Sequence, residues 1–300
     1  MQTIIVNTSM TGIKKNIDPG KPKIKLPSGK NYIKVKEIVQ NNHLHTICES
    51  GNCPNMATCW GNGTATFMIL GDICTRSCRF CSVKTGKPHP PDENEPFRVA
   101  NSVKLMNLKH CVITSVDRDD LPDYGSEIWA QTILEIKKQS PEITIETLIP
   151  DFNFDKTCLM RIINAKPDVV SHNLETVERL TKQVRVHAKY QTSLNVIKFL
   201  NDNGIITKSG IMLGLGETDK EVFQCMDDLL HSGCLILTIG QYLQPTKEQL
   251  PVKRFISENE FFNYKNAGLI KGFKIIESEA LVRSSYRSEN HLIKKVNDLI

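Results

Sequence analysis

Apolar residues in this chain fall into short runs that alternate with longer amphipathic stretches from about residue 66 onward. A short apolar run bounded by polar or glycine-rich segments is typical of a buried strand. Such runs predict strands at residues 66–73, 112–116, 143–149, 169–173, 207–213 and 235–242. Stretches with apolar residues at helical spacing predict helices at residues 126–139, 155–165, 192–203, 219–231 and 258–271.

The alternation of strands and helices predicts repeated βα units around a parallel sheet. The predicted units are fewer than a full TIM barrel needs, so the pattern favours an α/β fold with an open, partial (β/α)6 barrel. Barrels of this type carry their chemistry at the carboxyl ends of the strands. We therefore look for functional residues directly after each predicted strand.

Capping signals mark several helix ends. Ser126 is in position to cap the helix that begins there, with the acidic Glu127 in its first turn. Gly204 and Gly233 follow two other predicted helices, where a left-handed residue is needed.

The two ends of the chain look different from the barrel. Residues 1 to about 45 contain Pro and Gly with weak periodicity, which favours an extended arm over the core, with disorder as the alternative. We expect one domain, divided into an N-terminal extension at residues 1–62, a barrel at 63–275 and a C-terminal extension at 276–300.

The opening segment is also basic. A run of this kind is usually a hydrated surface, although it can dock an acidic protein. A nucleic-acid partner is not expected, because only Tyr32 is interleaved with the basic residues. Those residues are Lys14, Lys15, Lys21, Lys23, Lys25, Lys30, Lys34 and Lys36.

Composition narrows the class of protein. The chain of 300 residues is 40% hydrophobic and 24% charged, with a net charge of +5, as in ordinary globular proteins. No apolar run approaches the roughly 20 residues that a membrane span requires. The N-terminus resembles neither a secretory signal nor a mitochondrial presequence, so we expect a cytoplasmic protein.

The chain has 10 cysteines, and their placement suggests a metal site. In a reducing compartment, thiols stay free and serve metal binding or catalysis more often than disulfides. Six of them lie between residues 48 and 81. The other four are isolated, and we expect them to be small buried apolar residues; they are Cys111, Cys158, Cys225 and Cys234.

One triad follows the first predicted strand. Cys74, Cys78 and Cys81 form a C-x3-C-x2-C pattern. Three thiolates in one short loop can hold three irons of a [4Fe-4S] cluster and leave the fourth iron open, because such clusters prefer soft sulfur donors. A structural zinc site is the alternative, although zinc sites usually combine paired short spacings with four donors.

A second triad lies upstream. Cys48, Cys53 and Cys59 form a C-x4-C-x5-C pattern. A second set of three thiolates indicates a second cluster. Two clusters in one enzyme imply two roles: one generates a radical, and the other binds, activates or donates a group.

With both triads identified, residues 48–83 resemble the lipoyl synthase family of radical S-adenosylmethionine enzymes, in which a C-x4-C-x5-C auxiliary cluster precedes the radical site. The chain departs from the family pattern at Tyr124, where Gly is usual, and at Val186, where Pro is usual, but at no predicted ligand. The resemblance covers roughly residues 40–290. It includes residues 112–123, 148–152, 172–176, 209–217, 237–245 and 283–286.

The resemblance implies the cofactors and the reaction. The cofactors are two [4Fe-4S] clusters and S-adenosylmethionine, whose cleavage yields a 5'-deoxyadenosyl radical. The enzyme is a sulfurtransferase that inserts sulfur at C6 and C8 of an octanoyl group linked to a lysine. The auxiliary cluster is the expected sulfur donor, with Ser284 as its fourth ligand. Because oxygen suits such a site less well than thiolate, Ser284 should leave readily when the cluster is dismantled.

Further cofactor contacts are expected near the ends of strands. Asn173 and Glu175 are placed to bind the methionine or ribose part of S-adenosylmethionine, and Arg185 to meet a carboxylate. The alternative is a helix start in which Glu175 pairs with Arg179.

Two other sites are candidates for cofactor binding. Phe80 lies between two ligands of the first triad and either packs in the core or lies against the adenine. Gly214, Gly216 and Glu217 form a turn between a predicted strand and a helix. A glycine-containing turn alone is weak evidence for ligand binding, and it gains weight only from the family motif in which it lies.

The resemblance also implies partners. The substrates are octanoylated lipoyl-carrier domains, such as 2-oxoacid dehydrogenase E2 subunits or the glycine cleavage H protein, and a low-potential electron donor is required. One rival interpretation is another dual-cluster radical enzyme. A rival from a different class is a zinc-binding interaction module that docks nucleic acid with its basic arm.

Overall fold

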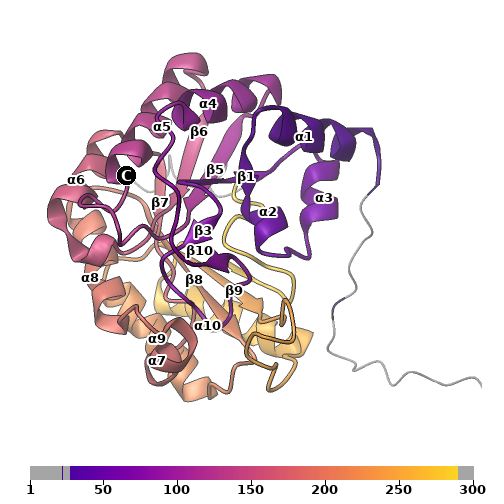
Figure 1. Cartoon of the computed structure of the whole chain (residues 1–300). Helices are drawn as coiled ribbons and strands as arrows, with labels where there is room; N and C mark the ends of the chain where they lie inside the picture. The colour runs from indigo at the N-terminus through magenta and orange to yellow at the C-terminus, as the bar shows by residue number, and fades with distance from the viewer. Residues whose placement is uncertain (1–21, 23–27, 290–300) are drawn as a thin grey trace, which may run out of the picture.

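A computed structural model describes residue 22 and residues 28–289, and its centre is one large sheet (Figure 1). The strands of that sheet lie in the order β1-β2-β5-β6-β7-β8-β9-β10. They are β1 (His45–Thr46), β2 (Thr66–Ile69), β5 (His110–Ser115), β6 (Thr144–Leu148), β7 (Val169–Ser171), β8 (Thr207–Leu213), β9 (Ile236–Gln241) and β10 (Ile275–Ser278). A separate pair joins β3 (Ile73–Cys74) to β4 (Lys84–Thr85).

From β2 to β10 every pairing is parallel, and only β1 runs antiparallel to its neighbour. Within the described residues, β1 and β10 are the two free edges, so the sheet does not close on itself. The predicted α/β fold with a partial barrel is therefore confirmed.

Helices follow the strands and cover the outside of the sheet (Figure 1). None of the helices in the described part of the chain has both the length and the apolar character needed to span a membrane. The helices are α1 (Lys30–Asn41), α2 (Ile47–Ser50), α3 (Met56–Gly61), α4 (Glu95–Leu105), α5 (Ser126–Gln139), α6 (Lys156–Asn164), α7 (Glu178–Arg185), α8 (Tyr190–Asp202), α9 (Asp219–His231) and α10 (Glu258–Lys271), with a short 3-10 turn η1 (Phe152–Phe154).

Strand boundaries differ from prediction where the backbone turns. The first predicted strand, 66–73, ends at Ile69 because Leu70 and Gly71 both have positive φ, at 69° and 94°. Ile73 instead begins β3, which leads directly into the first cysteine triad. The turn thus separates the barrel wall from the loop that carries the thiols.

Two predictions about the helices and the arm are wrong. Ser126 is the first residue of α5 and not its cap; the Asp123 carboxylate accepts the hydrogen bond from the backbone N–H of Glu127 instead. The opening segment is not wholly extended, because α1 occupies Lys30–Asn41 and buries Val35 and Val39. The remainder of the predicted arm, residues 1–21 and 23–27, lies outside the described residues.

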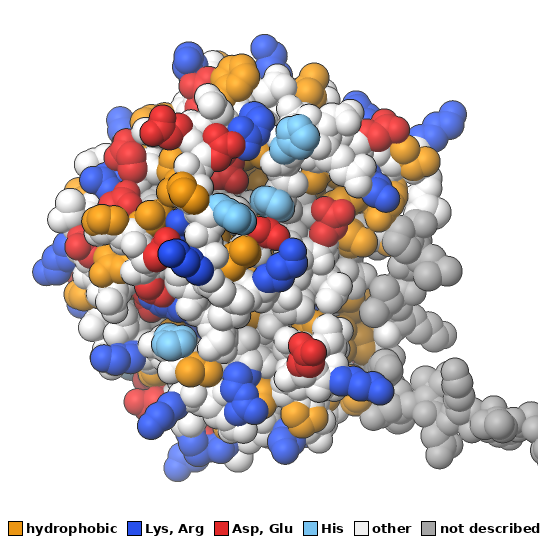
Figure 2. All heavy atoms as spheres, in the orientation of Figure 1, with side chains coloured by type: hydrophobic (Ala, Val, Ile, Leu, Met, Phe, Trp, Pro, Cys, Tyr) orange, Lys and Arg blue, Asp and Glu red, His pale blue; other side chains and the backbone are white. Residues whose placement is uncertain are grey.

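Other local predictions are confirmed. Gly204 and Gly233 have φ of 76° and 80°, the left-handed conformation expected after a helix. The four isolated cysteines are all buried, as expected. Cys111 lies on β5, Cys158 on α6 and Cys225 on α9, and Cys234 lies between α9 and β9. On the face shown in Figure 2, Lys and Arg side chains are interspersed with Asp and Glu and form no single basic patch.

Candidate iron-sulfur site inside the barrel

Both cysteine triads line one cavity of about 1200 Å³ on the inner side of the sheet. Its walls come from the barrel strands, from α1 to α3 on one side and from the C-terminal segment, residues 281–289, on the other. Residues more than 200 positions apart therefore face a single space, since Asn55 Nδ2 donates to the Leu281 carbonyl at 2.7 Å across 226 positions.

Cys74 of the first triad ends β3, and Cys78 and Cys81 lie in the loop between β3 and β4. The backbone N–H of Asp117, after β5, donates to Cys74 Sγ at 3.3 Å. The backbone N–H of Cys81 donates to the Cys78 carbonyl at 3.1 Å, which closes a turn between those two thiols. All three sulfurs border the cavity, so the structure brings the predicted ligands together.

Arg76, inside the same loop, ties the triad to the barrel. Its guanidinium contacts Asp119 at 2.7 Å, Asp151 at 2.8 Å and Asp117 at 3.4 Å. Burial raises the pKa of Asp117 to about 6. Burial also acts to raise the pKa of Asp151, but the hydrogen bond and the charge of Arg76, together with smaller contributions from its other neighbours, outweigh burial and lower that pKa to about 2. Sequence reasoning assigned no role to these residues.

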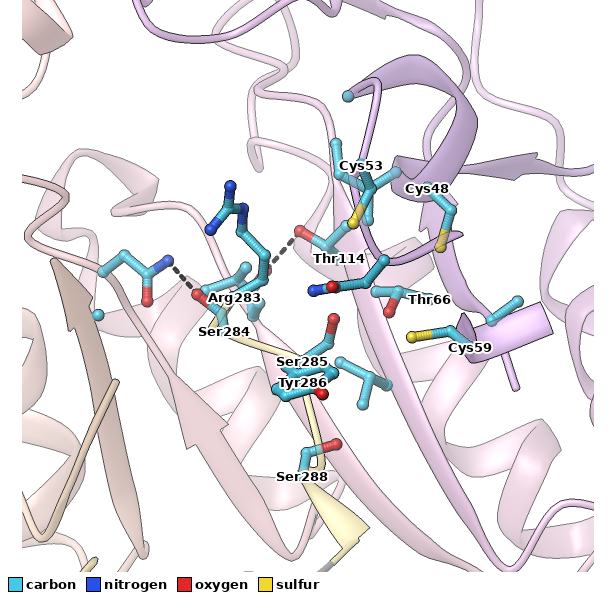
Figure 3. Close-up of a pocket in the computed structure, with 18 of the residues that line it drawn as sticks. Cys48, Cys53, Cys59, Thr66, Thr114, Arg283, Ser284, Ser285, Tyr286 and Ser288 are labelled. Carbon is cyan, nitrogen blue, oxygen red and sulfur yellow. Dashed lines mark hydrogen bonds between the residues drawn. The ribbon is translucent and has the colours of Figure 1, made fainter. Parts of the chain in front are cut away.

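The second triad lies on two short helices. Thr46 caps α2, accepting from the Glu49 backbone N–H at 3.3 Å, and Cys48 follows in the first turn. Cys53 lies in the turn between α2 and α3, where its backbone N–H donates to the Cys48 carbonyl at 3.0 Å. Cys59 lies on α3. Figure 3 shows the three sulfurs turned toward a common space.

The thiols of both triads are chemically suited to a cationic metal centre. Burial raises the pKa of Cys74 and of Cys78 to about 12. Burial, and then the neighbouring Cys53, raise the pKa of Cys48 to about 11. Burial disfavours the charged thiolate form, and neighbouring thiolates would repel one another. These thiols therefore lose their protons readily only when a cation is bound, and soft sulfur donors match iron.

The number of donors in each triad bears on the choice between a cluster and a single zinc ion. A lone zinc ion draws its ligands to about 2.3 Å from one centre. Among the residues that the structure describes, no group of three or more His, Cys, Asp or Glu side chains is arranged to hold a metal ion. Each triad offers three of the four donors that a structural zinc site uses, so a centre that takes three thiolates from each set is the better match.

The C-terminal segment places its serines differently from expectation. The Ser284 hydroxyl accepts a hydrogen bond from Asn173 Nδ2 at 2.6 Å. Figure 3 shows this hydroxyl turned away from the second triad, whereas the neighbouring Ser285 hydroxyl points toward it. The segment is thus brought to the cavity, but the role of Ser284 as an iron ligand stays a prediction.

Four of the predicted contacts to S-adenosylmethionine border the same cavity: Phe80, Asn173, Glu175 and Arg185. Glu175 accepts from Asn173 Nδ2 at 2.9 Å, and burial raises its pKa. Arg185 donates to the Leu174 carbonyl at 3.3 Å and to Ser193.

The alternative explanation for Glu175 is wrong. The helix α7 begins at Glu178, after Glu175. Arg179 pairs with Glu221 at 2.6 Å, on the outside of the barrel. Glu175 faces the cavity instead, where it contributes to raising the pKa of Cys81.

The turn after β8 does not reach the cavity. Gly214, Gly216 and Glu217 are absent from its lining. The Glu217 carboxylate accepts from the backbone N–H groups of Gly214 at 2.6 Å and Leu215 at 2.9 Å, so it is used to close its own turn. The geometry gives no support to a cofactor role for these residues.

Comparison with known proteins agrees with the site. A model of the Radical SAM superfamily matches residues 68–229. The lipoyl synthase of Christiangramia forsetii is 56% identical over 292 residues, 96% of this chain and 100% of that protein. The mitochondrial lipoyl synthase of Nematostella vectensis is 56% identical over 290 residues, 94% of this chain and 100% of that protein.

A solved structure supports the fold. Streptococcus suis SuiB bound to S-adenosylmethionine matches with a TM-score of 0.58 at 10% identity, over 75% of this chain and 54% of that chain. At this level of identity the likeness concerns the arrangement of strands and helices alone.

Proposed function

This chain belongs to the lipoyl synthase family of the radical S-adenosylmethionine superfamily, and from that premise we propose how its residues divide the work of sulfur insertion. The reaction places two sulfur atoms, at C6 and C8, on an octanoyl group bound to a lysine. The observation that carries the proposal is that two separate sets of three thiols border one cavity.

The first triad holds the radical-generating cluster. Cys74, Cys78 and Cys81 bind three of its irons and leave the fourth for S-adenosylmethionine. When bound, these cofactors supply an electron and a carbon-centred radical. Support comes from the position of the loop, which Arg76 fastens to the carboxyl ends of β5 and β6.

The second triad holds the cluster that serves as sulfur source. Cys48, Cys53 and Cys59 supply three ligands, and we assign the fourth to Ser284. Its hydroxyl lies on a segment inside the same cavity, and an oxygen ligand is weaker than thiolate toward iron. Its weaker bond suits a cluster that is consumed.

The remaining cavity residues bind and shield the reactants. Glu175 and Asn173 would accept and donate hydrogen bonds to the amino and ribose groups of S-adenosylmethionine, Arg185 would pair with its carboxylate, and Phe80 would pack against the adenine; all four residues border the cavity. The walls exclude water, which would otherwise quench a radical.

The macromolecular partners follow from the reaction. The substrates we propose are octanoylated lipoyl-carrier domains, of 2-oxoacid dehydrogenase E2 subunits or of the glycine cleavage H protein, together with a low-potential electron donor. We propose a cytoplasmic location, and a relative from Nematostella vectensis carries "mitochondrial" in its name.

Two matched substitutions test this division of labour. Cys74→Ala removes a ligand of the radical cluster, so 5'-deoxyadenosine formation from S-adenosylmethionine should fall to background in anaerobically reconstituted protein. Cys48→Ala leaves that cluster intact, so 5'-deoxyadenosine should still form while mass spectrometry of an octanoylated carrier peptide shows no added sulfur. Cys225→Ala, a buried thiol outside the cavity, is the control.

Two results would contradict the proposal. Normal 5'-deoxyadenosine formation in the Cys74 variant would remove the radical cluster from that loop. Thiolated product from the Cys48 variant would remove the sulfur-donor role from the second triad.

A further inference from the structure

An ion pair lies inside the barrel, where neither charge meets water. Lys208 on β8 and Glu146 on β6 have side chains that are 0% and 1% exposed. Lys208 Nζ is 2.7 Å and 3.0 Å from the two Glu146 carboxylate oxygens. Ser171, on the strand between them, donates to the same carboxylate at 3.0 Å.

Burial of such a pair is not explained by stability. Removing two charges from water costs about as much as their attraction returns, and apolar residues of the same volume often stabilise a protein equally well. The pair also borders no part of the first triad. The remaining explanation is that the pair holds another part of the chain in place. The other contact of Lys208 indicates which part that is.

The lysine reaches the C-terminal segment. Lys208 Nζ donates to the backbone carbonyl of Ser284 as well as to Glu146. On the other side of the same residue, Asn173 Nδ2 donates to the Ser284 hydroxyl. Ser284 is therefore hydrogen-bonded at its backbone carbonyl by Lys208 on β8 and at its hydroxyl by Asn173, which follows β7.

The rest of the segment is fastened at its ends. The Leu281 carbonyl accepts from Asn55, and Ser288 Oγ lies 2.9 Å from His110 Nε2 at the start of β5. Between these points the chain passes along the inside of the barrel, beside the second triad (Figure 3). The Lys208 contact is a charged one from the barrel wall to the middle of the segment, at Ser284 and next to Ser285.

We propose that the Lys208–Glu146 pair is a positioning device, which fixes the backbone at Ser284 and so sets where the hydroxyls of Ser284 and Ser285 stand relative to the second triad. Glu146 holds the lysine in place and neutralises it. The lysine acts on the auxiliary site without touching its thiols. This role rests on the proposed function only for the identity of the metal centre.

The test uses a charge-neutral double variant of the full-length, reconstituted protein. Lys208→Met with Glu146→Gln removes the donor to Ser284 while leaving no unpaired buried charge, and Gln can still accept from Ser171. Backbone amides of residues 284–288 should then exchange with deuterium roughly tenfold faster or more, because a hydrogen bond from a charged donor is lost. The Mössbauer signature of the auxiliary cluster should shift toward that of Ser284→Ala, the variant that lacks the proposed fourth ligand.

The matched control makes the same chemical change elsewhere. Arg179→Met with Glu221→Gln neutralises an exposed pair outside the barrel and should change neither the exchange of residues 284–288 nor the spectrum. Formation of 5'-deoxyadenosine should be similar in both double variants, because the radical cluster is not involved.

A second variant guards against misfolding. The exchanged pair Lys208→Glu with Glu146→Lys keeps both charges but puts an acceptor in place of the donor at position 208, so the segment should again loosen. Wild-type exchange rates at residues 284–288 in either folded variant would overturn the proposal. Failure of the proposed function would appear separately, as absence of thiolated product from wild-type protein, whereas deuterium exchange does not depend on product.

Discussion

At the scale of single residues, His172 shows how burial sets a protonation state. Its Nδ1 lies 2.9 Å from the Ile149 carbonyl and must donate, so Nε2 of the neutral ring accepts from Ser193 Oγ, also at 2.9 Å. Arg185 donates to that same hydroxyl. Burial, and then the nearby Arg185, lower the pKa of His172 to about 4.

This histidine makes stability depend on pH. The unfolded chain has a histidine pKa near 6.5, so between that pH and about 4 the unfolded state binds more protons, and stability falls as pH falls. From pH 7 to about pH 5 the loss from this residue is on the order of 2 kcal/mol. His172→Gln retains one donor and one acceptor, and it should flatten this part of the profile, measured by urea unfolding under anaerobic conditions. An unchanged slope would show that His172 titrates normally.

The sequence predicted those site residues that belong to a motif, because the spacing of a cysteine motif is compatible with few other functions. The six cysteines of the two triads were assigned from spacing, and all of them border the cavity. Lys208 and Glu146 could not be found, because each is a single charged residue within a predicted strand, where exposure on the sheet is the usual explanation. Only tertiary structure shows that both point inward.

At the scale of elements, the loop between β3 and β4 depends on its neighbours for its shape. Its two strands pair over only two residues each, Ile73–Lys84 and Cys74–Thr85. So short a pairing gives the loop little support of its own. The Arg76 guanidinium adds hydrogen bonds that tie the loop to the carboxylates of Asp119, after β5, and Asp151, after β6. The side chain is 9% exposed, so these contacts are largely shielded from solvent.

Substituting this arginine should loosen the radical site. Lysine keeps the charge of Arg76 but cannot make paired hydrogen bonds to Asp119 and Asp151 at once. Arg76→Lys should therefore lower the iron bound at the first triad and reduce 5'-deoxyadenosine formation roughly tenfold. Arg161→Lys, on the outer face of α6, is the comparison and should leave both quantities unchanged. Full iron content and full turnover in the Arg76 variant would mean that the loop holds its own shape.

The elements that prediction missed have physical reasons. Helix α4 begins in a polar stretch with Pro96 in its first turn, which looks like a loop, although Pro is tolerated there. Strand β10 is only four residues long, Ile275–Ser278, and gains its regularity from pairing with β9. Tyr124, where the family usually has Gly, has a φ of 53°. This is the left-handed conformation, which a bulky residue such as Tyr rarely adopts and which the sequence therefore does not predict.

At the scale of the whole molecule, segments that are far apart in the sequence meet at one cavity of the barrel. Helices α2 and α3 bring the second triad from one end, and residues 281–289 come from the other. Described segments of both predicted extensions therefore border the cavity together with the barrel strands. The boundaries at residues 62 and 275 stay predictions.

The fit of the C-terminal segment depends on a glycine. A Cβ at Gly240, on β9, would lie 2.1 Å from the Val282 carbonyl oxygen, which is too close for the backbone to keep its place. Gly240→Ala should push the segment away from the barrel, so thiolated product should fall roughly tenfold or more while 5'-deoxyadenosine still forms.

The comparison for this substitution is Gly61→Ala, where an added Cβ would meet nothing within 4 Å. It should retain product formation. Equal product yields from the two alanine variants would mean that the segment adapts to the lost space and is not tightly seated.

The contact between Asn55 and Leu281 has a consequence for biosynthesis. A ribosome makes residues 48–59 long before residues 281–288, so the emerging polypeptide carries three uncovered thiols with nothing to seal them. The wall that residues 281–288 add to the cavity is completed only when translation is nearly over. Premature termination before residue 281 would therefore leave a thiol-bearing product open to oxidation, and not a slower catalyst.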